Sequence, residues 1–244
     1  MAWFDDAFGP WYLKLYAHRD REEAARTLSA LDPWLPRGGR MLDVACGMGR
    51  HLEVLLGRGI PAVGVDRSAT LLDHAPDSVR GHLVRGDMRR LPFGDRMFLG
   101  LLSFFTSFGY FGTREAHEDL LTEFARVALP QGRLVLDVAN PPHVLSTLCP
   151  SSERVVEGHT AEERRFVEHR DHETVVIKAV QIKDAGGRSV ASYCEEISLY
   201  ERDALIDMLN RTGWLEIKSL GNYGGDDWSP QAPRLIVVAE RRRA

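Results

Sequence analysis

Residues 41–51, MLDVACGMGRH, place an acid inside a short apolar run and two glycines directly after that run. The run 41–46 has no helical period and predicts a buried strand, whereas the residues from Gly49 to Gly57 favour a helix. Glycines at the carboxyl end of a strand let the backbone approach a ligand closely. The segment therefore predicts a strand, a glycine turn and a helix that together face a ligand.

The same strand and helix unit recurs along the chain. Apolar runs predict further strands at 60–66, 82–87, 98–104 and 133–138. Residues 20–31 favour a helix, and Ser68 and Thr113 are expected to cap two others, the second of which ends at Leu129 before a turn at 130–132. Alternating strands and helices predict a parallel, doubly wound α/β sheet.

Residues 143–197 have a different texture, in which charged and β-branched residues alternate, as in RRFVEHRDHETVVIKAVQIKD at 164–184. This pattern predicts an inserted antiparallel β subdomain. One face of the insert is expected to cover a substrate pocket, or else to form a dimer interface. The α/β pattern resumes with a helix at 201–211 and strands at 214–220 and 234–240, which should pair as a hairpin because no helix separates them.

These patterns divide the chain into three parts. The expected domains are an N-terminal helical lid (1–36), a ligand-binding α/β domain (37–142 and 198–244) and an inserted antiparallel β cap (143–197). Tyr12 and Tyr16 lie four residues apart in the first part, on one face of an expected helix. They either cover the bound ligand or simply dock the helix by hydrophobic contact.

Two further acids are expected at the edge of the sheet where Gly47 lies. Asp66 ends the second strand, about 20 residues after the glycines, where a carboxylate accepts hydrogen bonds from both hydroxyls of a ribose. Asp87 ends the third strand in the same register. The carboxyl ends of parallel strands meet at one edge, so the sequence predicts a nucleoside site.

These residues resemble the class I S-adenosylmethionine-dependent methyltransferases, and the resemblance covers almost the whole chain. It implies the Rossmann-like methyltransferase fold, a doubly wound, mostly parallel seven-stranded sheet, and S-adenosylmethionine as cofactor. Asp66 matches the ribose-binding acid of the family, and Asp87-Met88 matches the pair that contacts adenine. The segment 103–111, SFFTSFGYF, resembles small-molecule methyltransferases that carry a β insertion. Ala45 departs from the pattern, because many members have glycine there.

The resemblance implies cofactor contacts for Asp43, Ala45, Gly47, Gly49, Asp66, Asp87 and Met88. Arg67 and Phe104, which lie at the same edge of the sheet, and Tyr12 and Tyr16, as a lid, are also expected to contact the cofactor. No catalytic residue is assigned. A sulfonium is already an activated leaving group, so a neutral amine or carboxylate needs only desolvation and alignment, whereas a hydroxyl or carbon nucleophile would need a base. The expected reaction is in-line methyl transfer to a small-molecule acceptor, and the acceptor atom stays open.

Two other functions are compatible with these residues. An NAD-dependent oxidoreductase also has an acid after its glycines, but it normally shows G-x-G-x-x-G, and the last position here is Leu52. A non-catalytic sensor of S-adenosylmethionine or S-adenosylhomocysteine would keep the same site. Asp137 and Asn140, after the fifth strand, either hold a polar substrate group or cap a loop.

Composition narrows the possible partners. The chain is 44% hydrophobic and 27% charged, which is typical of one globular core. Its three separated cysteines and nine histidines suggest neither a disulfide framework nor a metal site, and a net charge of −4 disfavours nucleic acid. The apolar run 97–111 is too short to cross a membrane, and the first residues lack a signal-peptide pattern. We expect a cytoplasmic monomer or homodimer that acts on a small molecule.

Overall fold

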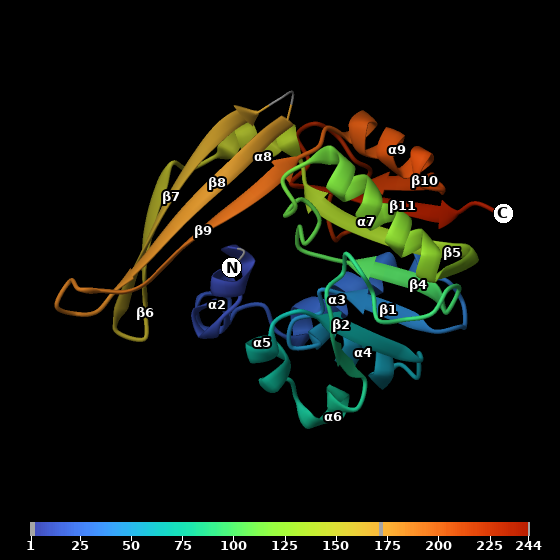
Figure 1. The fold of residues 1–244 in the computed structure, drawn as a ribbon, viewed down its shortest axis with the longest axis horizontal. Coiled ribbons are helices and arrows are strands. Elements are labelled where there is room, and N and C mark those ends of the chain that lie inside the picture. The colour runs from blue at the N-terminus through green and yellow to red at the C-terminus, as the bar shows by residue number, and fades with distance from the viewer. Residues whose placement is uncertain (1–2, 171–172, 244) are drawn as a thin grey trace.

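The computed structural model describes residues 3–170 and 173–243, whose strands form two separate sheets (Figure 1). The larger sheet has seven strands in the order β10-β11-β5-β4-β1-β2-β3. Its neighbours from β5 to β3 are parallel, and β11 is antiparallel to both β5 and β10. The strands are β1 (Met41–Val44), β2 (Ala62–Asp66), β3 (Leu83–Arg85), β4 (Phe98–Ser103), β5 (Ala128–Ala139), β10 (Trp214–Leu220) and β11 (Arg234–Arg241). The predicted doubly wound sheet and its terminal hairpin are confirmed.

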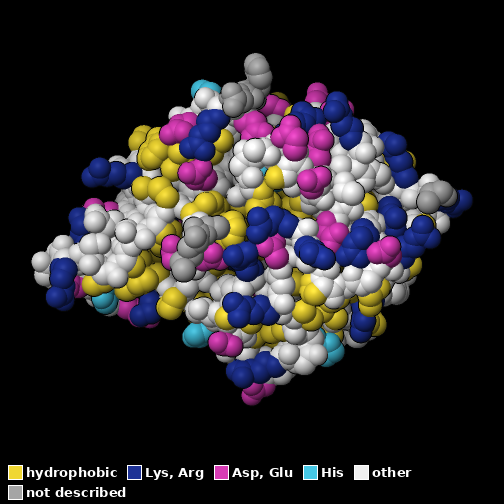
Figure 2. Space-filling model, in the orientation of Figure 1, with side chains coloured by type: hydrophobic (Ala, Val, Ile, Leu, Met, Phe, Trp, Pro, Cys, Tyr) yellow, Lys and Arg dark blue, Asp and Glu magenta, His cyan; other side chains and the backbone are white. Residues whose placement is uncertain are grey.

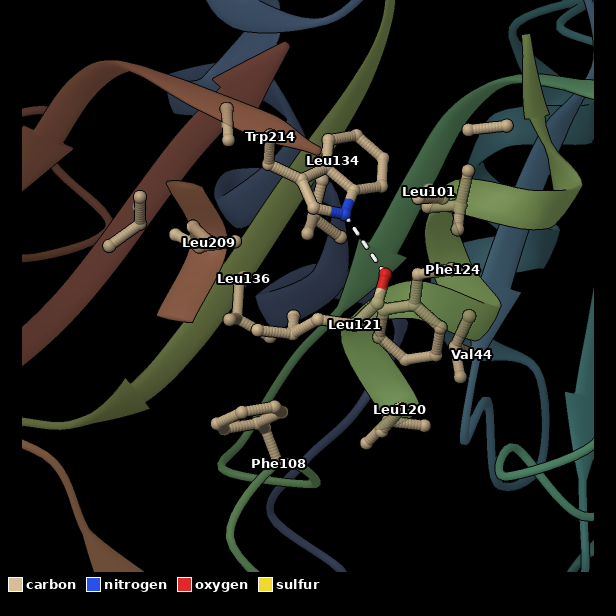
Figure 3. Packing of buried hydrophobic residues seen from close by; sticks show 14 of the residues in the cluster. Val44, Leu101, Phe108, Leu120, Leu121, Phe124, Leu134, Leu136, Leu209 and Trp214 are labelled. Carbon is tan, nitrogen blue, oxygen red and sulfur yellow. Dashed lines mark hydrogen bonds between the residues drawn. The ribbon is translucent and has the colours of Figure 1, made fainter. Parts of the chain in front are cut away.

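Helices cover both faces of this sheet because successive side chains of each strand point to opposite faces. Leu42 and Val44 of β1 pack with α7 and α9, whereas Met41 packs with α3 and α4. In the first cluster the indole N–H of buried Trp214 donates to the carbonyl of Leu121 at 3.0 Å (Figure 3). The helices are α1 (Trp3–Ala7), α2 (Pro10–Leu15), α3 (Arg21–Leu31), a short 3-10 turn η1 (Asp32–Trp34), α4 (Arg50–Gly57), α5 (Ala69–Asp73), α6 (Asp77–Arg80), α7 (Arg114–Val127), α8 (Pro141–Thr147) and α9 (Arg202–Arg211).

Side-chain caps start three of these helices. Asp20, Ser68 and Thr113 each accept a hydrogen bond from the backbone N–H three residues later, which satisfies one of the free donors of the first turn. The caps predicted at Ser68 and Thr113 are therefore confirmed. They determine where α5 and α7 begin.

The chain enters β5 earlier than the sequence predicts. Helix α7 ends at Val127 and β5 begins at once, so that 130–132 lie inside the strand as an irregularity with Gln131 at a φ of +64°. The backbone N–H groups of Arg96 and Met97 donate to the carbonyls of Arg126 and Val127. These bonds draw the end of the helix into the sheet, so the prediction that the helix reaches Leu129 is wrong.

The second sheet is a four-stranded antiparallel meander in chain order, β6-β7-β8-β9. Its strands are β6 (Ser151–Val156), β7 (His159–Arg170), β8 (Glu173–Lys183) and β9 (Ser189–Leu199). Figure 1 shows this sheet standing away from the larger one, with the N-terminal helices between them. Leu15 of α2 packs against Ala161, Val180 and Ile182, so one face of the second sheet supports the N-terminal segment.

Candidate functional site

A cavity of about 720 Å³ lies at the carboxyl edge of the larger sheet, within the size range of sites that bind drug-sized molecules. Its wall combines the ends of β1, β2 and β4, the N-terminal helices and the inner face of the second sheet. All of the residues assigned from the sequence line it except Gly49. Those in the wall are Tyr12, Tyr16, Asp43, Ala45, Gly47, Asp66, Arg67, Asp87, Met88 and Phe104.

The turn after β1 has a left-handed backbone. Gly47 has a φ of +58° and Gly49 one of +80°, and Gly49 is the N-cap of α4. A Cβ on Gly49 would lie 3.2 Å from Val79, so this glycine serves the packing of the turn. Ala45 also has a positive φ, +56°, which costs a non-glycine residue roughly 1 kcal/mol. The turn therefore carries strain at the point where it meets the cavity.

Asp66 ties the glycine turn to the next helix. Its Oδ2 accepts a hydrogen bond from the N–H of Gly47 at 2.7 Å, and its Oδ1 accepts one from the N–H of Ser68 at 2.8 Å. Burial raises the pKa of this carboxyl, although these backbone donors oppose the shift. Each carboxylate oxygen has more than one acceptor position, so both oxygens can still accept a bond from a ligand hydroxyl.

Asp43 is the most deeply buried acid of the cavity wall. Its side chain is 1% exposed, and its Oδ2 accepts no hydrogen bond from any described residue. The pKa of Asp43 is raised to about 7, chiefly by burial; the charge of Arg50 opposes this shift and the charge of Asp66 adds to it. A buried carboxylate oxygen without a hydrogen-bond donor is costly, so this position favours a ligand that brings a donor or a positive charge to Oδ2.

Asp87 differs from the other two acids because two arginines hold it. Arg89 and Arg67 both donate to its carboxylate, and the hydrogen bonds from Arg89 lower its pKa to about 2 with help from Arg67. Arg67 also pairs with Asp5 of α1 at 2.9 Å. Oδ1 of Asp87 accepts two hydrogen bonds and Oδ2 accepts three, so, unlike Asp66, this carboxylate has no acceptor position left, and contact with an adenine amino group would require an arginine to move. Met88 lies beside it in the wall.

The segment after β4 enters the cavity in a strained conformation. Phe105 and Thr106 have φ values of +57° and +62°, which are unfavourable for bulky and β-branched residues. Asp137, which is fully buried, holds both of them: its carboxylate accepts the N–H of Phe105 at 2.7 Å and its carbonyl accepts that of Thr106 at 3.1 Å. The ring of Phe104 packs on that of His51, with ring centroids 4.5 Å apart.

The sequence left two roles open for Asp137 and Asn140, contact with substrate and capping of a loop. Their positions do not support contact with substrate. Neither residue lines the cavity. Asp137 pairs with Arg234 at 2.7 Å and accepts a hydrogen bond from Tyr223. The Nδ2 of Asn140 donates to three carbonyls of the loop before β11. Both side chains therefore hold loops.

The structure places Tyr12 and Tyr16 in the cavity wall, on a segment that also docks on the second sheet, and their contact with a bound ligand stays a prediction. Their rings are 4.7 Å apart and both line the cavity, while α2 also docks on the second sheet through Leu15. The hydroxyl of Tyr12 accepts a hydrogen bond from Arg19 at 3.3 Å, and that of Tyr16 accepts one from Lys178 at 2.7 Å.

The structure adds many wall residues that the sequence did not assign to the site, among them Arg19, His51, Tyr110, Lys178 and Glu195. For one of them, Lys178, the sequence contains a signal that could have indicated a place in the site. Lys178 interrupts the otherwise apolar inner face of β8, between Val176 and Val180. A lysine on a buried face usually has a polar partner, and that signal could have indicated Lys178. Its partner Glu195 lies on another strand, so only the fold identifies it.

Neither a metal-binding cluster nor a membrane-spanning helix is found among the described residues. Within residues 3–170 and 173–243, no three His, Cys, Asp or Glu side chains are grouped so as to hold a metal ion. No helix in the same residues is both long and apolar enough to cross a membrane.

A mostly parallel α/β sheet with a cavity at its carboxyl edge and an antiparallel last strand defines a class of fold. Comparison with known proteins shows what the chain resembles. Residues 41–132 match the family described as "Methyltransferase domain". The chain is 33% identical over 133 residues to dTDP-3-amino-3,4,6-trideoxy-alpha-D-glucopyranose N,N-dimethyltransferase of Streptomyces venezuelae, covering 52% of this chain and 54% of that protein. It is 34% identical over 119 residues to the dTDP-3-amino-3,6-dideoxy-alpha-D-glucopyranose N,N-dimethyltransferase of Streptomyces fradiae, covering 47% and 45%. The chain thus spans about half the length of the curated relatives it matches.

Solved structures share the fold over nearly the whole chain. An amino pentose methyltransferase from Micromonospora echinaspora, solved with S-adenosylmethionine bound, has a TM-score of 0.69 at 24% identity, covering 94% of this chain and 96% of that one. A methyltransferase from Streptomyces caelestis has a TM-score of 0.75 at 14% identity, covering 91% and 90%. Residues 41–132 thus match a methyltransferase domain, and nearly the whole chain shares the fold of S-adenosylmethionine-dependent methyltransferases, in agreement with the resemblance seen in the sequence.

Proposed function

We propose that this protein transfers the methyl group of S-adenosylmethionine to a nitrogen of a small polar acceptor, such as an amino sugar. The observation that carries the proposal is a single cavity with two kinds of wall. One side presents Asp43, the glycine turn and Asp66 from the larger sheet, and the opposite side presents polar groups of the second sheet. Cofactor and acceptor would meet in this cavity.

The residues of the first side suit the cofactor. The free acceptor positions on Asp66 match the two hydroxyls of a ribose, and the unpartnered Oδ2 of Asp43 matches a positively charged amino group. When bound, S-adenosylmethionine supplies a methyl group activated on a sulfonium, which a nucleophile takes by in-line displacement. The wall residues Phe104 and Phe105 exclude water from this region, and the strained segment that carries them is held by Asp137.

A nitrogen acceptor agrees with the side chains in the wall. A neutral amine needs alignment and desolvation more than it needs a base, and its extra proton can leave to solvent. Arg234 pairs with Asp137 and Lys178 pairs with Glu195, so the charges of these side chains are balanced by partners within the protein. The relatives in Streptomyces are named for dimethylation of dTDP-linked amino sugars, which supports the same acceptor class here.

Calorimetry with S-adenosylmethionine, S-adenosylhomocysteine and NADH tests the cofactor. We expect both sulfur compounds to bind and NADH not to bind. Binding of NADH without either sulfur compound would reject the proposal in favour of an oxidoreductase.

A transfer assay tests the acceptor. S-adenosylmethionine labelled in its methyl group is incubated with dTDP-3-amino-3,6-dideoxy-alpha-D-glucopyranose and with free amino sugars, and the products are examined by mass spectrometry. We expect addition of a methyl group to at least one amine. Cofactor binding without transfer to any amine in the panel would contradict the nitrogen acceptor and favour a sensor.

A further inference from the structure

The inner face of the second sheet carries a charged pair, Lys178 and Glu195, next to a second ion-paired group formed by Glu163, Arg154 and Arg165. Val176, Val180 and Ile182 of β8 are buried on this face, and Lys178 lies among them. Its cross-strand neighbour on β9 is Glu195, and the two charged groups are 2.8 Å apart. Their side chains are only 12% and 14% exposed, and both line the cavity.

This pair keeps hydrogen-bonding capacity that the protein does not use. The Lys178 ammonium has three N–H donors and uses two of them, on Glu195 and on the hydroxyl of Tyr16. Among the residues that the structure describes, none donates a hydrogen bond to Oε1 of Glu195. A buried ion pair gives little net stability over a well-packed apolar pair, so a structural role alone explains the pair poorly.

A third polar group lies beside the pair. Tyr110 follows β4 and lines the cavity, and its hydroxyl makes no hydrogen bond with the described part of the chain. Burial raises the pKa of Tyr110 well above its ordinary value, and the nearby charge of Glu195 raises it further. Ser198, on the same strand as Glu195, donates its N–H to the carbonyl of Gly109 at 2.8 Å, so Glu195 of β9 and Tyr110 of the segment after β4 line neighbouring parts of the cavity wall.

We propose that Lys178, Glu195 and Tyr110 form the acceptor-binding subsite, and that the subsite takes a ring carrying an amine next to a hydroxyl. Lys178 donates to the hydroxyl oxygen, and Glu195 accepts an N–H or O–H from the adjacent substituent. A donor and an acceptor in direct contact suit substituents on neighbouring ring carbons, as in an amino sugar. This inference rests on the proposed function and names the residues that select its acceptor.

The pair also anchors the N-terminal helix through Tyr16, so a test must separate recognition from structure. Two small probes do this: trans-2-aminocyclohexanol, which has both substituents, and cyclohexylamine, which lacks the hydroxyl. Their affinities are measured by titration NMR on the full-length protein saturated with S-adenosylhomocysteine. A purely structural pair would not distinguish the two probes.

We expect the wild type to bind the amino alcohol about tenfold more tightly than the amine, as loss of one hydrogen bond to a charged group implies. Glu195→Gln and Lys178→Met should remove this preference. Tyr110→Phe, which breaks no hydrogen bond within the described chain, should weaken binding of the amino alcohol severalfold. Lys183→Met is the matched control, because Lys183 pairs with Glu162 on the same sheet outside the cavity and should keep the wild-type preference.

Equal affinity for the two probes, or no saturable binding of either, would overturn the subsite. The same conclusion follows if all three variants keep the preference. Failure of the wild type to bind S-adenosylhomocysteine would instead reject the proposed function, together with this inference. Bound S-adenosylhomocysteine without discrimination between the probes rejects the subsite alone.

Discussion

Three aspartates in one cavity illustrate how the surroundings of a residue decide its role. Asp87 is neutralised by arginines, Asp66 is held by two backbone N–H groups, and Oδ2 of Asp43 has no partner among the described residues. The first is already satisfied by the protein, whereas the other two have acceptor capacity left for a ligand. Cofactor binding should therefore depend more on Asp66 and Asp43 than on Asp87.

Replacing Asp66 by alanine tests its contact with the ribose. We expect Asp66→Ala to lose about 1 to 3 kcal/mol of affinity for S-adenosylhomocysteine, because hydrogen bonds to a charged acceptor are removed. Calorimetry measures the loss. Asp73→Ala, at the exposed end of α5, is the control and should bind like the wild type. Unchanged affinity of Asp66→Ala would show that the carboxylate does not contact the ligand.

The buried Asp43 predicts a pH dependence of stability. Its pKa is raised from 3.8 to about 7 in the folded protein, so the folded state binds the proton more tightly than the unfolded state. The free energy of unfolding should therefore fall as the pH rises from about 4 to about 7, by up to ~4 kcal/mol for this group. Denaturant unfolding of the ligand-free protein should show a smaller fall for Asp43→Asn. An equally steep fall in this variant would contradict the assignment.

Among the elements, the segment between β4 and α7 connects the two sheets. Gly109 accepts a hydrogen bond from the N–H of Ser198 in β9 at 2.8 Å, and Tyr110 beside it lines the cavity. The φ of Gly109 is +116°, and a Cβ at this position would lie 2.9 Å from the carbonyl oxygen of Ser198. Glycine is therefore required here both by the conformation and by the close approach of β9.

Adding one methyl group at this contact should separate the sheets locally. We expect Gly109→Ala to lower the free energy of unfolding by about 2 kcal/mol or more, from backbone strain together with the steric clash. Gly112→Ala is the control: its φ is +76°, but a Cβ there meets nothing within 4 Å, so strain alone should cost roughly 1 kcal/mol. Chemical denaturation compares the two variants. Equal losses would show that the contact with β9 contributes nothing.

On the scale of the whole molecule, three parts of the chain close around one cavity. The N-terminal segment joins the other two: Ser68 donates to the carbonyl of Phe8 at 2.7 Å, and Arg154 of β6 donates to that of Leu15 at 3.0 Å. The N-terminal segment therefore depends for its position on contacts with both of the other parts.

On the face shown in Figure 2, basic and acidic side chains are interspersed over the surface.

Loosening this segment should weaken ligand binding without unfolding the core. Leu15 is 3% exposed, and truncating a buried leucine to alanine costs about 2 to 5 kcal/mol. We expect Leu15→Ala to speed amide hydrogen exchange in residues 3–20 and to weaken binding of S-adenosylhomocysteine, while exchange in β1 and β4 stays slow. Leu145→Ala, at a 42% exposed position, is the control. Uniformly faster exchange would mean that the segment is not a separate unit.

Local patterns predicted most of the elements because their causes are local. The apolar run of β1, the glycines of the turn after it, and the caps at Ser68 and Thr113 act within a few residues. The end of α7 was placed too late, because distant backbone donors on 96 and 97 set it. The domain boundaries and the cofactor contacts expected from the sequence stay predictions that the binding experiments address.

The sequence by itself determined the order of strands and helices, the glycine turn and the acids at the edge of the sheet, since each depends on spacing along the chain. Only the tertiary structure decided that arginines form ion pairs with Asp87, that Asp137 hydrogen-bonds to a strained loop, and that Lys178 pairs with Glu195 in the cavity wall. These contacts join residues far apart in the chain. Their energies depend on burial and on which polar atoms remain without partners, and both are properties of the packed molecule.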